Sequence, residues 1–379
     1  MRSPIVELTT LSTILGNHNS HVGDFLDRVL IHEFFDSLHP KLFSKGGLYR
    51  AIRGYVPRPE YYDAELPAHE HRSETLVSPM TESLRQMLGR HGALYLKNTT
   101  STVGGGHGLV KMTADAEKVQ LRIPRSGTRD YIKHALDRLF WDKPEDFIRF
   151  STYSHQEPDI VDIPIMKTRA NQPLEKILYA LLKHAFEPGE YVIEAPTQIP
   201  LYNGRTWEVR NIVQCPNGKP QISARYAKVG SGKDFSNIAL GGEPENPETV
   251  IAGVYQTHTQ TAPRTAQKLA KEYLRVNDGI VLDAANALNR YMFELAARHV
   301  DGIDSRIFYA REFSVDITGE FNGTQKLRPV VNELQYPMGH MTYIPELSIT
   351  NPRNLDIIYE IKRVMKEQDA VLLNQVLTK

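Results

Sequence analysis

The sequence has almost no cysteine and no net charge. Cys215 is the only cysteine in 379 residues, so the chain can form no internal disulfide and has no cysteine cluster for zinc. We read Cys215, in the apolar segment NIVQC, as a small core residue rather than a nucleophile. Lys and Arg together number 45, as do Asp and Glu. This balance excludes a broadly basic nucleic-acid-binding protein, because phosphate backbones are bound by excess positive charge.

Long hydrophobic runs are missing as well. No segment approaches the roughly 20 apolar residues that a membrane-spanning helix needs, and residues 1–21 are a poor match to a signal peptide. Hydrophobic residues nevertheless make up 41% of the chain, which is typical of a folded globular protein. We therefore expect a cytoplasmic protein with no membrane span and no nucleic-acid partner.

Hydrophobic periodicity predicts interleaved helices and strands, which is an α+β or mixed class. The Pro-, Gly- and charge-rich residues 54–74 are interpreted as a long surface connection, and a domain boundary is placed there. Helices are predicted at residues 22–35, 81–91, 129–139, 174–186, 262–276, 278–299 and 354–377. Strands are predicted at residues 93–98, 109–112, 119–123, 191–196, 206–214, 221–229, 311–317 and 329–335.

The densest glycine cluster follows the predicted strand that ends near Lys97. Glycines let a backbone approach a ligand closely and direct several N–H groups at phosphate oxygens. The pattern is neither a Walker A motif nor a dinucleotide fingerprint, so by itself it fits a flexible hairpin tip slightly better. The cluster consists of Gly104, Gly105, Gly106 and Gly108.

A second glycine-containing segment, Gly230 to Lys233, resembles a P-loop fragment only superficially. A P-loop requires an earlier glycine where this chain has Ala227, and a Ser or Thr where it has Asp234. We interpret the segment as a turn between strands.

Acidic residues recur in two apolar strands near the C-terminus. Asp316 lies in one predicted strand, and Glu333 and Gln335 lie two apart in the next, so the latter two share a face. If the strands pair, the three side chains can form an oxygen-rich site suited to Mg²⁺ bridged to phosphates. The alternative is an exposed polar strand face, which is less favourable for acids among apolar neighbours.

Taken in order, these motifs resemble the ATP-grasp superfamily over residues 74–340. The resemblance is closest to the spore-coat-associated branch, with the ribosomal-protein glutamate ligases next. It implies an α+β ATP-grasp fold, in which two subdomains grip ATP, preceded by an atypical N-terminal region. Residues 1–73 would form that region, as a reduced pre-grasp or substrate domain. Residues 74–190 would form the small subdomain with its glycine-rich lid, and residues 191–379 the large subdomain with the Mg²⁺ site and the C-terminal helix.

The resemblance also implies roles for individual residues at the nucleotide. Lys97 and the glycine cluster match the groups that contact the ATP phosphates. Glu194 matches the acceptor for the adenine amino group, with Ala195 contributing its backbone. Glu208 would bind the ribose hydroxyls, and Arg210 would lie near the transferred phosphate.

Further matches concern the chemistry. Arg225, Lys228 and Asn237 lie in a run similar to that of the glutamate ligases, which implies contacts to phosphate and acyl phosphate. The magnesium ligands would be Asp316, Glu333 and Gln335. The family normally has Asn at the third position, so Gln335 is one methylene longer.

The activity implied by this resemblance is an ATP- and Mg²⁺-dependent ligase that joins a carboxylate to an amine through an acyl phosphate. The substrates would be small molecules or peptides. Two alternatives remain open: a non-catalytic nucleotide-binding protein, and a kinase-like phosphotransferase on the same fold. We expect alanine at Asp316 or Glu333 to abolish ATP turnover and leave the fold intact.

Overall fold

The computed structural model describes only part of the chain, and the fold is given for that part. The described residues are 45–98, 109–115, 118–122, 160–164, 174–184, 186–236, 242–299, 309–323, 325–336 and 353–377. The predicted helices at 22–35 and 129–139, the glycine cluster and Asn237 lie outside these residues.

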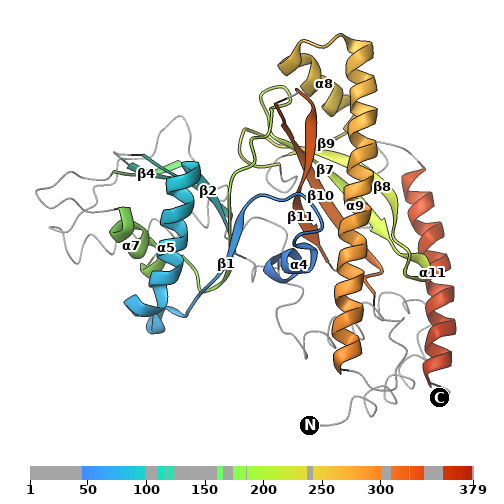
Figure 1. The fold of residues 1–379 in the computed structure, drawn as a ribbon, viewed down its shortest axis with the longest axis horizontal. Coiled ribbons are helices and arrows are strands. Elements are labelled where there is room, and N and C mark those ends of the chain that lie inside the picture. The colour runs from blue at the N-terminus through green and yellow to red at the C-terminus, as the bar shows by residue number, and fades with distance from the viewer. Residues whose placement is uncertain are drawn as a thin grey trace, which may run out of the picture.

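The first half of the described chain builds a six-stranded sheet with the strand order β1-β6-β2-β3-β4-β5, in which every neighbouring pair is antiparallel. Helices α5 (Glu74–His91) and α7 (Leu174–His184) cover one face of it (Figure 1). Apolar side chains of alternating strand residues, such as Leu94 and Leu96, form the core beneath these helices. The strands are β1 (Tyr61–Leu66), β2 (Ala93–Asn98), β3 (Leu109–Ala114), β4 (Lys118–Arg122), β5 (Ile160–Pro164) and β6 (Gly189–Glu194).

Helix α5 ends at a glycine, one residue beyond the end of the helix predicted at 81–91. Gly92 has a φ of 68°, in the left-handed region, and its N–H donates to the carbonyl of Leu88. Glycine adopts this conformation without steric cost, which is why it ends helices so often.

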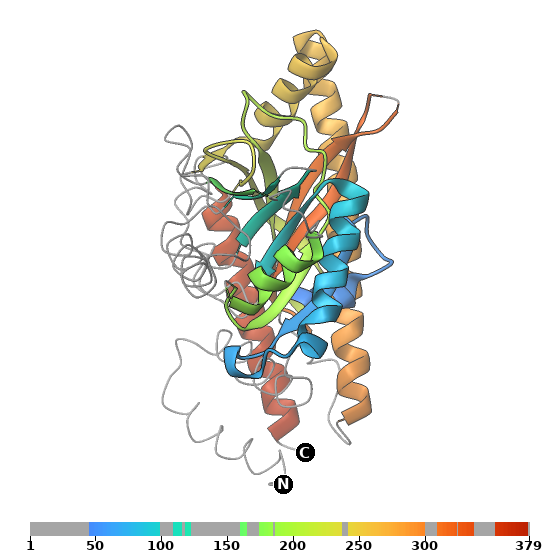
Figure 2. The ribbon, with the colours of Figure 1, turned by 90° about the vertical axis from the view of Figure 1, so that its left-hand side faces the viewer.

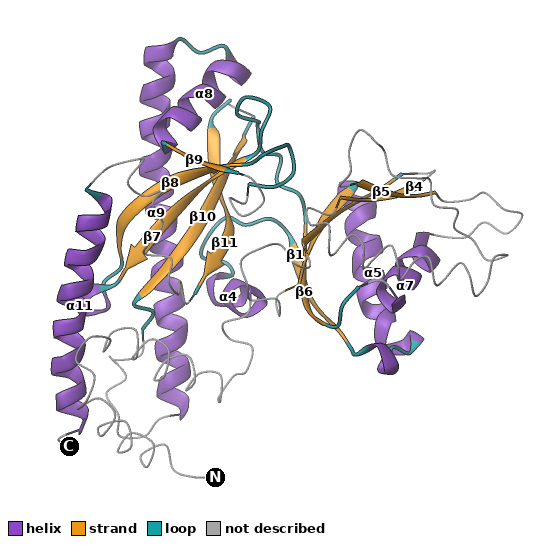
Figure 3. Cartoon of the chain, turned by 180° about the vertical axis from the view of Figure 1, so that it is seen from behind, coloured by secondary structure: helices purple, strands orange, loops and turns teal. Residues whose placement is uncertain are grey.

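The second half builds a five-stranded sheet with the order β11-β10-β7-β8-β9. Helix α9 (Pro263–His299) and α8 (Pro247–Thr259) pack on one face, and α11 (Asn354–Leu377) lies along the β8 side (Figures 1 and 3). Cys215 is fully buried in this core, as predicted. The strands are β7 (Trp207–Gln214), β8 (Gln221–Val229), β9 (Glu243–Glu245), β10 (Glu312–Phe321) and β11 (Leu327–Gln335). Short 3-10 turns occur at His69–His71 and Pro216–Gly218.

The two helices predicted at 262–276 and 278–299 are wrong as separate elements, because α9 is continuous over 37 residues. Two polar residues lie where the two predicted helices adjoin, and both have partners on the sheet. Asn277 is buried and donates to the side-chain oxygen of Asn211 on β7, and Asp278 pairs with Arg225 on β8 at 2.7 Å. These tertiary contacts accompany an uninterrupted helix at residues that often favour helix ends.

The reading of residues 54–74 as a surface connection is also wrong. This segment contains β1, an edge strand that pairs with β6 along its whole length. Edge strands carry charges on their open side, so their composition resembles that of a loop. The short helix α4 (Lys45–Ile52) precedes it and contacts β6 of the first sheet and β11 of the second (Figure 1). Figure 2 views the molecule from the side of the first sheet, with α5 in front of α9.

Helices and antiparallel sheets together confirm the α+β class. The first sheet contains β1, which lies before residue 73, and β6, which continues past residue 190. The sheet therefore crosses both positions that the sequence suggested as domain boundaries. In the part of the chain that the structure describes, none of the helices has the length and apolar character to cross a membrane.

Candidate functional site

One row of side chains crosses the open face of the six-stranded sheet. Strand register aligns its members one opposite the next, and residues directly opposite each other point to the same face. The neighbouring residues on each strand face the core beneath α5 and α7, so the row faces away from those helices. From β1 to β4 the row consists of Tyr61, Glu194, Tyr95, Lys111 and Arg122.

A second row crosses the five-stranded sheet in the same manner. Val209 and Ile317 pack in the core with α8 and α9, so the residues next to them on their strands point to the opposite face. From β8 to β11 the row consists of Tyr226, Arg210, Asp316 and Glu333. Glu208 and Lys228, themselves register partners, lie two residues further along β7 and β8 on that face.

The two faces meet. Lys97 on β2 donates to the side-chain oxygen of Asn332 on β11 at 3.4 Å. Tyr95 donates to the backbone carbonyl of Asp234, in the segment after β8, and the Asp234 carboxylate pairs with Lys111 and with Arg122 at 2.7 Å. The candidate site is therefore the region between the two sheets, lined by the charged rows of both.

The strongest electrostatic feature is a buried network around Asp316, whose side chain is 1% exposed. Arg210 donates to both of its oxygens, at 2.8 and 2.7 Å, and Lys228 donates to one of them at 2.7 Å. Lys228 also pairs with Glu208. Burial alone would raise the pKa of Asp316, but the two cations outweigh it and hold the pKa well below its usual range.

A second ion pair lies on the six-stranded sheet. The Nζ atom of Lys97 is 2.8 Å from the Oε2 atom of Glu194, whose side chain is 3% exposed. Burial is the largest single influence and would lower the pKa of Lys97, but Glu194, together with Tyr49 and Glu333, outweighs it and raises the pKa above its ordinary value. Lys97 is thus held as a cation inside the site.

A β-bulge directs two polar side chains of β11 into the site. The register passes from Asp316 opposite Glu333 to Ile317 opposite Val331, so Asn332 is the additional residue. Val331 and Leu334 both pack in the core, while Asn332 and Glu333 between them are half-buried. Asn332 donates to Glu208 and accepts from Lys97, and therefore connects the two sheets.

The predicted magnesium ligands fit a metal ion only in part. Both oxygens of Asp316 already accept from Arg210 and Lys228, so this carboxylate does not fit as a ligand in the present arrangement. Glu333 and Gln335 share the face and are half-buried, and one carboxylate plus an amide suits Mg²⁺ when phosphates complete its shell. Within the described residues, no cluster of three or more His, Cys, Asp or Glu side chains is suited to a metal.

Two other predicted residues are placed differently from the rest. Arg225 lies on the α9 face of β8, where it pairs with Asp278, so it does not join Lys228 in the site. Ala195 directly follows β6, and its N–H donates to the carbonyl of Glu60 at 2.8 Å. The Ala195 N–H is therefore committed to the chain itself. The structure does bring together Lys97, Glu194, Glu208, Arg210, Lys228, Asp316 and Glu333.

Several residues of the site were not predicted. Asn332 could have been found from the sequence. Two polar residues between Val331 and Leu334 interrupt the alternation of a strand, which indicates a bulge. Arg58, which lies 3.9 Å from Glu194, and Asp234 were also missed. Both lie in irregular segments, where sequence periodicity does not predict to which side a side chain points.

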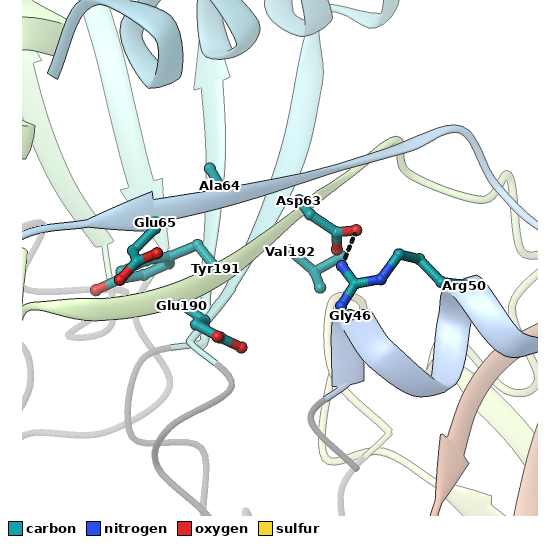
Figure 4. Close-up of a pocket in the computed structure, with 8 residues that line it drawn as sticks. All are labelled: Gly46, Arg50, Asp63, Ala64, Glu65, Glu190, Tyr191 and Val192. Carbon is teal, nitrogen blue, oxygen red and sulfur yellow. Dashed lines mark hydrogen bonds and ion pairs between the residues drawn. The ribbon is translucent and has the colours of Figure 1, made fainter. Parts of the chain in front are cut away.

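A small cavity of about 220 Å³ lies beside the site, between α4 and strands β1 and β6. Figure 4 shows Arg50 of α4 reaching across it to Asp63 of β1, with a nitrogen-to-oxygen distance of 2.7 Å. Glu65 and Glu190 also line the cavity. Arg50 is 40% exposed, so this ion pair contributes little to stability.

Comparisons with known proteins give only distant likenesses. D-alanyl-alanine synthetase A from Vibrio cholerae O1 biovar eltor str. N16961 is 11% identical, with a TM-score of 0.36 over 86% of this chain and 66% of that one. D-cycloserine synthetase DcsG is 9% identical, with a TM-score of 0.35 over 85% of this chain and 70% of that one. Scores this low carry no argument about chemistry. No protein-family model and no curated protein matches the chain.

Proposed function

We propose that the chain is an ATP-dependent carboxylate–amine ligase of the ATP-grasp type. The observation that carries the proposal is the buried charge cluster between the two sheets, in which Asp316 holds Arg210 and Lys228. Buried ion pairs are often no better for stability than well-packed apolar side chains, whereas they are common where a site must bind charged groups. The resemblance to the ATP-grasp superfamily supports the proposal that these charged groups are the phosphates of ATP.

ATP would bind between the two rows. Lys97 and Lys228 would offset the phosphate charge. Phosphate oxygens would accept hydrogen bonds from donors that now donate to carboxylates of the chain. Glu194 would accept from the adenine amino group, and Glu208 would accept from the ribose hydroxyls. The glycine cluster and Asn237, which match the lid and an acyl-phosphate contact by resemblance, complete this assignment.

The chemistry has two steps. A substrate carboxylate attacks the γ-phosphorus, so that the bond to ADP breaks and an acyl phosphate forms. An amine then attacks the acyl carbon, phosphate leaves and the nitrogen loses a proton. Positioning and charge neutralisation are the main requirements of phosphoryl transfer. The planar guanidinium of Arg210, fixed by Asp316, suits the developing charge on the transferred group.

Glu333 and Gln335 are the residues that would hold Mg²⁺. When bound, the ion would neutralise phosphate charge. Asp316 would act instead as the carboxylate that orients Arg210 and Lys228.

Two observations favour an alternative, a nucleotide-binding protein without turnover. Both oxygens of Asp316 are already engaged, and Gln335 stands where the family normally has Asn. A kinase-like phosphotransferase is a further outcome that the same experiment would reveal.

The test is product analysis with the purified full chain, ATP, Mg²⁺ and a panel of amino acids and peptides. The proposal expects ADP, phosphate and a new amide in equal amounts. ADP with a phosphorylated product would indicate the kinase, and ATP binding without ADP release from any pair would indicate the non-catalytic protein.

A further inference from the structure

Arg58 is a buried arginine that makes no hydrogen bond within the described part of the chain. It lies in the loop between α4 and β1, and its side chain is 5% exposed. Its guanidinium carbon lies 3.2 Å above the ring centre of Tyr49, and none of its three nitrogens donates a hydrogen bond to a described group. The Oε2 atom of Glu194, 3.9 Å away, is its ion-pair partner. Buried polar groups are almost always satisfied, so this exception requires an explanation.

A second group at the same place is also unsatisfied. The hydroxyl of Tyr61 is buried and makes no hydrogen bond with a described group, and Tyr61 lies directly opposite Glu194 in the sheet register. The guanidinium is 5.3 Å from the Tyr61 ring centre. Two unsatisfied groups beside one carboxylate indicate that a polar ligand belongs here.

The arrangement around Glu194 has a defined hydrogen-bonding order. Arg58 approaches its carboxylate from the loop before β1, and Lys97 approaches it from β2 at 2.8 Å. Both flanking side chains are donors only, and the carboxylate between them is an acceptor. The site therefore presents a donor, an acceptor and a donor.

Adenine carries the complementary order, because its amino group is a donor between two ring-nitrogen acceptors, N1 and N7. Guanine carries an acceptor, O6, at the central position, and a carboxylate there would repel it. N7 belongs to the ring that bears the ribose, and Lys97 leads into the glycine cluster proposed for the phosphates. Lys97 therefore belongs on the N7 side, and Arg58 on the N1 side.

We propose that Arg58 donates to N1 of adenine and is a specificity-determining residue of the nucleotide site. The inference rests on the proposed function, since it requires that ATP binds at Glu194. It adds a residue that no motif in the sequence indicated, from the segment that precedes the first sheet. The resemblance assigned a backbone contact with the base to Ala195, but its N–H donates to the carbonyl of Glu60. Arg58 would supply a donor to the base in its place.

The test measures binding to the full-length protein by calorimetry for ATP, 1-deaza-ATP, 7-deaza-ATP and GTP. Loss of a hydrogen bond to a charged donor should weaken 1-deaza-ATP binding about tenfold to a hundredfold relative to ATP. GTP should bind more weakly still. In Arg58→Met, which keeps the side-chain length, ATP should weaken by a similar factor and the penalty for 1-deaza-ATP should vanish. The penalty for 7-deaza-ATP should persist.

Arg50→Met is the matched control, because Arg50 lies on nearby α4 in an exposed ion pair and should leave all four affinities unchanged. Equal binding of ATP and 1-deaza-ATP to the unmodified protein overturns the inference and leaves the proposed function standing. A 1-deaza penalty that survives in Arg58→Met overturns it too. Absence of ATP binding removes the proposed function itself. If Arg58→Met does not fold, the analogue series on the unmodified protein decides.

Discussion

The two faces of the site hold their charges in opposite ways. On the five-stranded sheet, Asp316 satisfies Arg210 and Lys228 within one network. On the six-stranded side, Arg58 is buried, makes no hydrogen bond to any residue that the structure describes, and lies 3.9 Å from Glu194. The charged groups of the first face are paired within the chain, and the proposed function assigns Arg210 and Lys228 to the phosphates from this network. Within the described residues the second face has groups that are not satisfied, and we propose that these groups select the base of the ligand.

The largest expected effect comes from breaking the complete network. Asp316→Ala leaves Arg210 and Lys228 buried without their carboxylate, and removing one partner of a buried pair typically destabilises by about 3–5 kcal/mol. Urea unfolding should show this loss together with loss of turnover. From the sequence we expected the fold of this variant to stay intact; from the buried network we now expect it to be destabilised. Glu320→Ala, at an exposed ion pair on the same strand, should change stability by less than about 1 kcal/mol.

Acid should weaken the same network without a mutation. Because its cation partners lower the pKa of Asp316, the carboxylate stabilises the fold fully above the unfolded Asp pKa of about 3.9. That contribution is lost as the pH falls from there toward the lower folded-state pKa. Urea midpoints measured at a series of falling pH values should therefore converge for the unmodified protein and Asp316→Ala. A constant difference down to the acid limit would contradict the assigned pairing.

Glu333→Ala should separate chemistry from stability. Glu333 is half-buried at the open side of β11, so its removal should cost about 1 kcal/mol or less. Turnover should nonetheless fall by about a hundredfold or more, as for loss of a group that acts on developing charge. ADP release at the normal rate would remove Glu333 from the proposed metal site.

Lys97→Ala tests the incomplete face. Lys97 pairs with Glu194 and, in the proposed function, would also contact phosphate, so its loss should weaken ATP binding about tenfold to a hundredfold by calorimetry. Lys233→Ala is the control, because Lys233 is exposed and belongs to the segment that only resembles a P-loop. Equal affinities for ATP in both variants would contradict the phosphate role of Lys97.

The smallest effect is expected where the two faces touch. Asn332→Ala removes the amide between Lys97 and Glu208, and one such hydrogen bond contributes about 1 kcal/mol. ATP affinity should change only a few-fold, which calorimetry can resolve. A loss as large as that of Lys97→Ala would mean that contact between the sheets, rather than the cation, controls binding.

Strand periodicity predicted one part of the site, the acidic group near the C-terminus, whereas the residues proposed for the nucleotide came from the resemblance to the ATP-grasp superfamily. Glu333 and Gln335 are two apart and share a face, and Asp316 lies directly opposite Glu333 as expected for a hairpin. The same rule predicts that Arg225 and Lys228 of β8 do not share a face. Arg225 and Lys228 are three apart, so a regular strand places them on opposite faces, and Arg225 indeed pairs with α9.

The features that were missed depend on local irregularity or on distant partners. The bulge at Asn332 interrupts the two-residue alternation of β11, on which the strand prediction was based. The continuity of α9 through Asn277 depends on Asn211, which is 66 positions away in the chain. Propensity cannot anticipate such partners, because long-range contacts override local preference.

The sequence alone determined the α+β class, most strand and helix positions, and which residue types could serve a polyphosphate. Those are consequences of hydrophobic period and side-chain chemistry, which are local properties. Only the tertiary structure decided that Asp316 is engaged by two cations, that Arg225 lies outside the site, and that Arg58 lies within it. Burial and pairing between segments distant in sequence fix the environment of each charge, and that environment determines what the charge can bind.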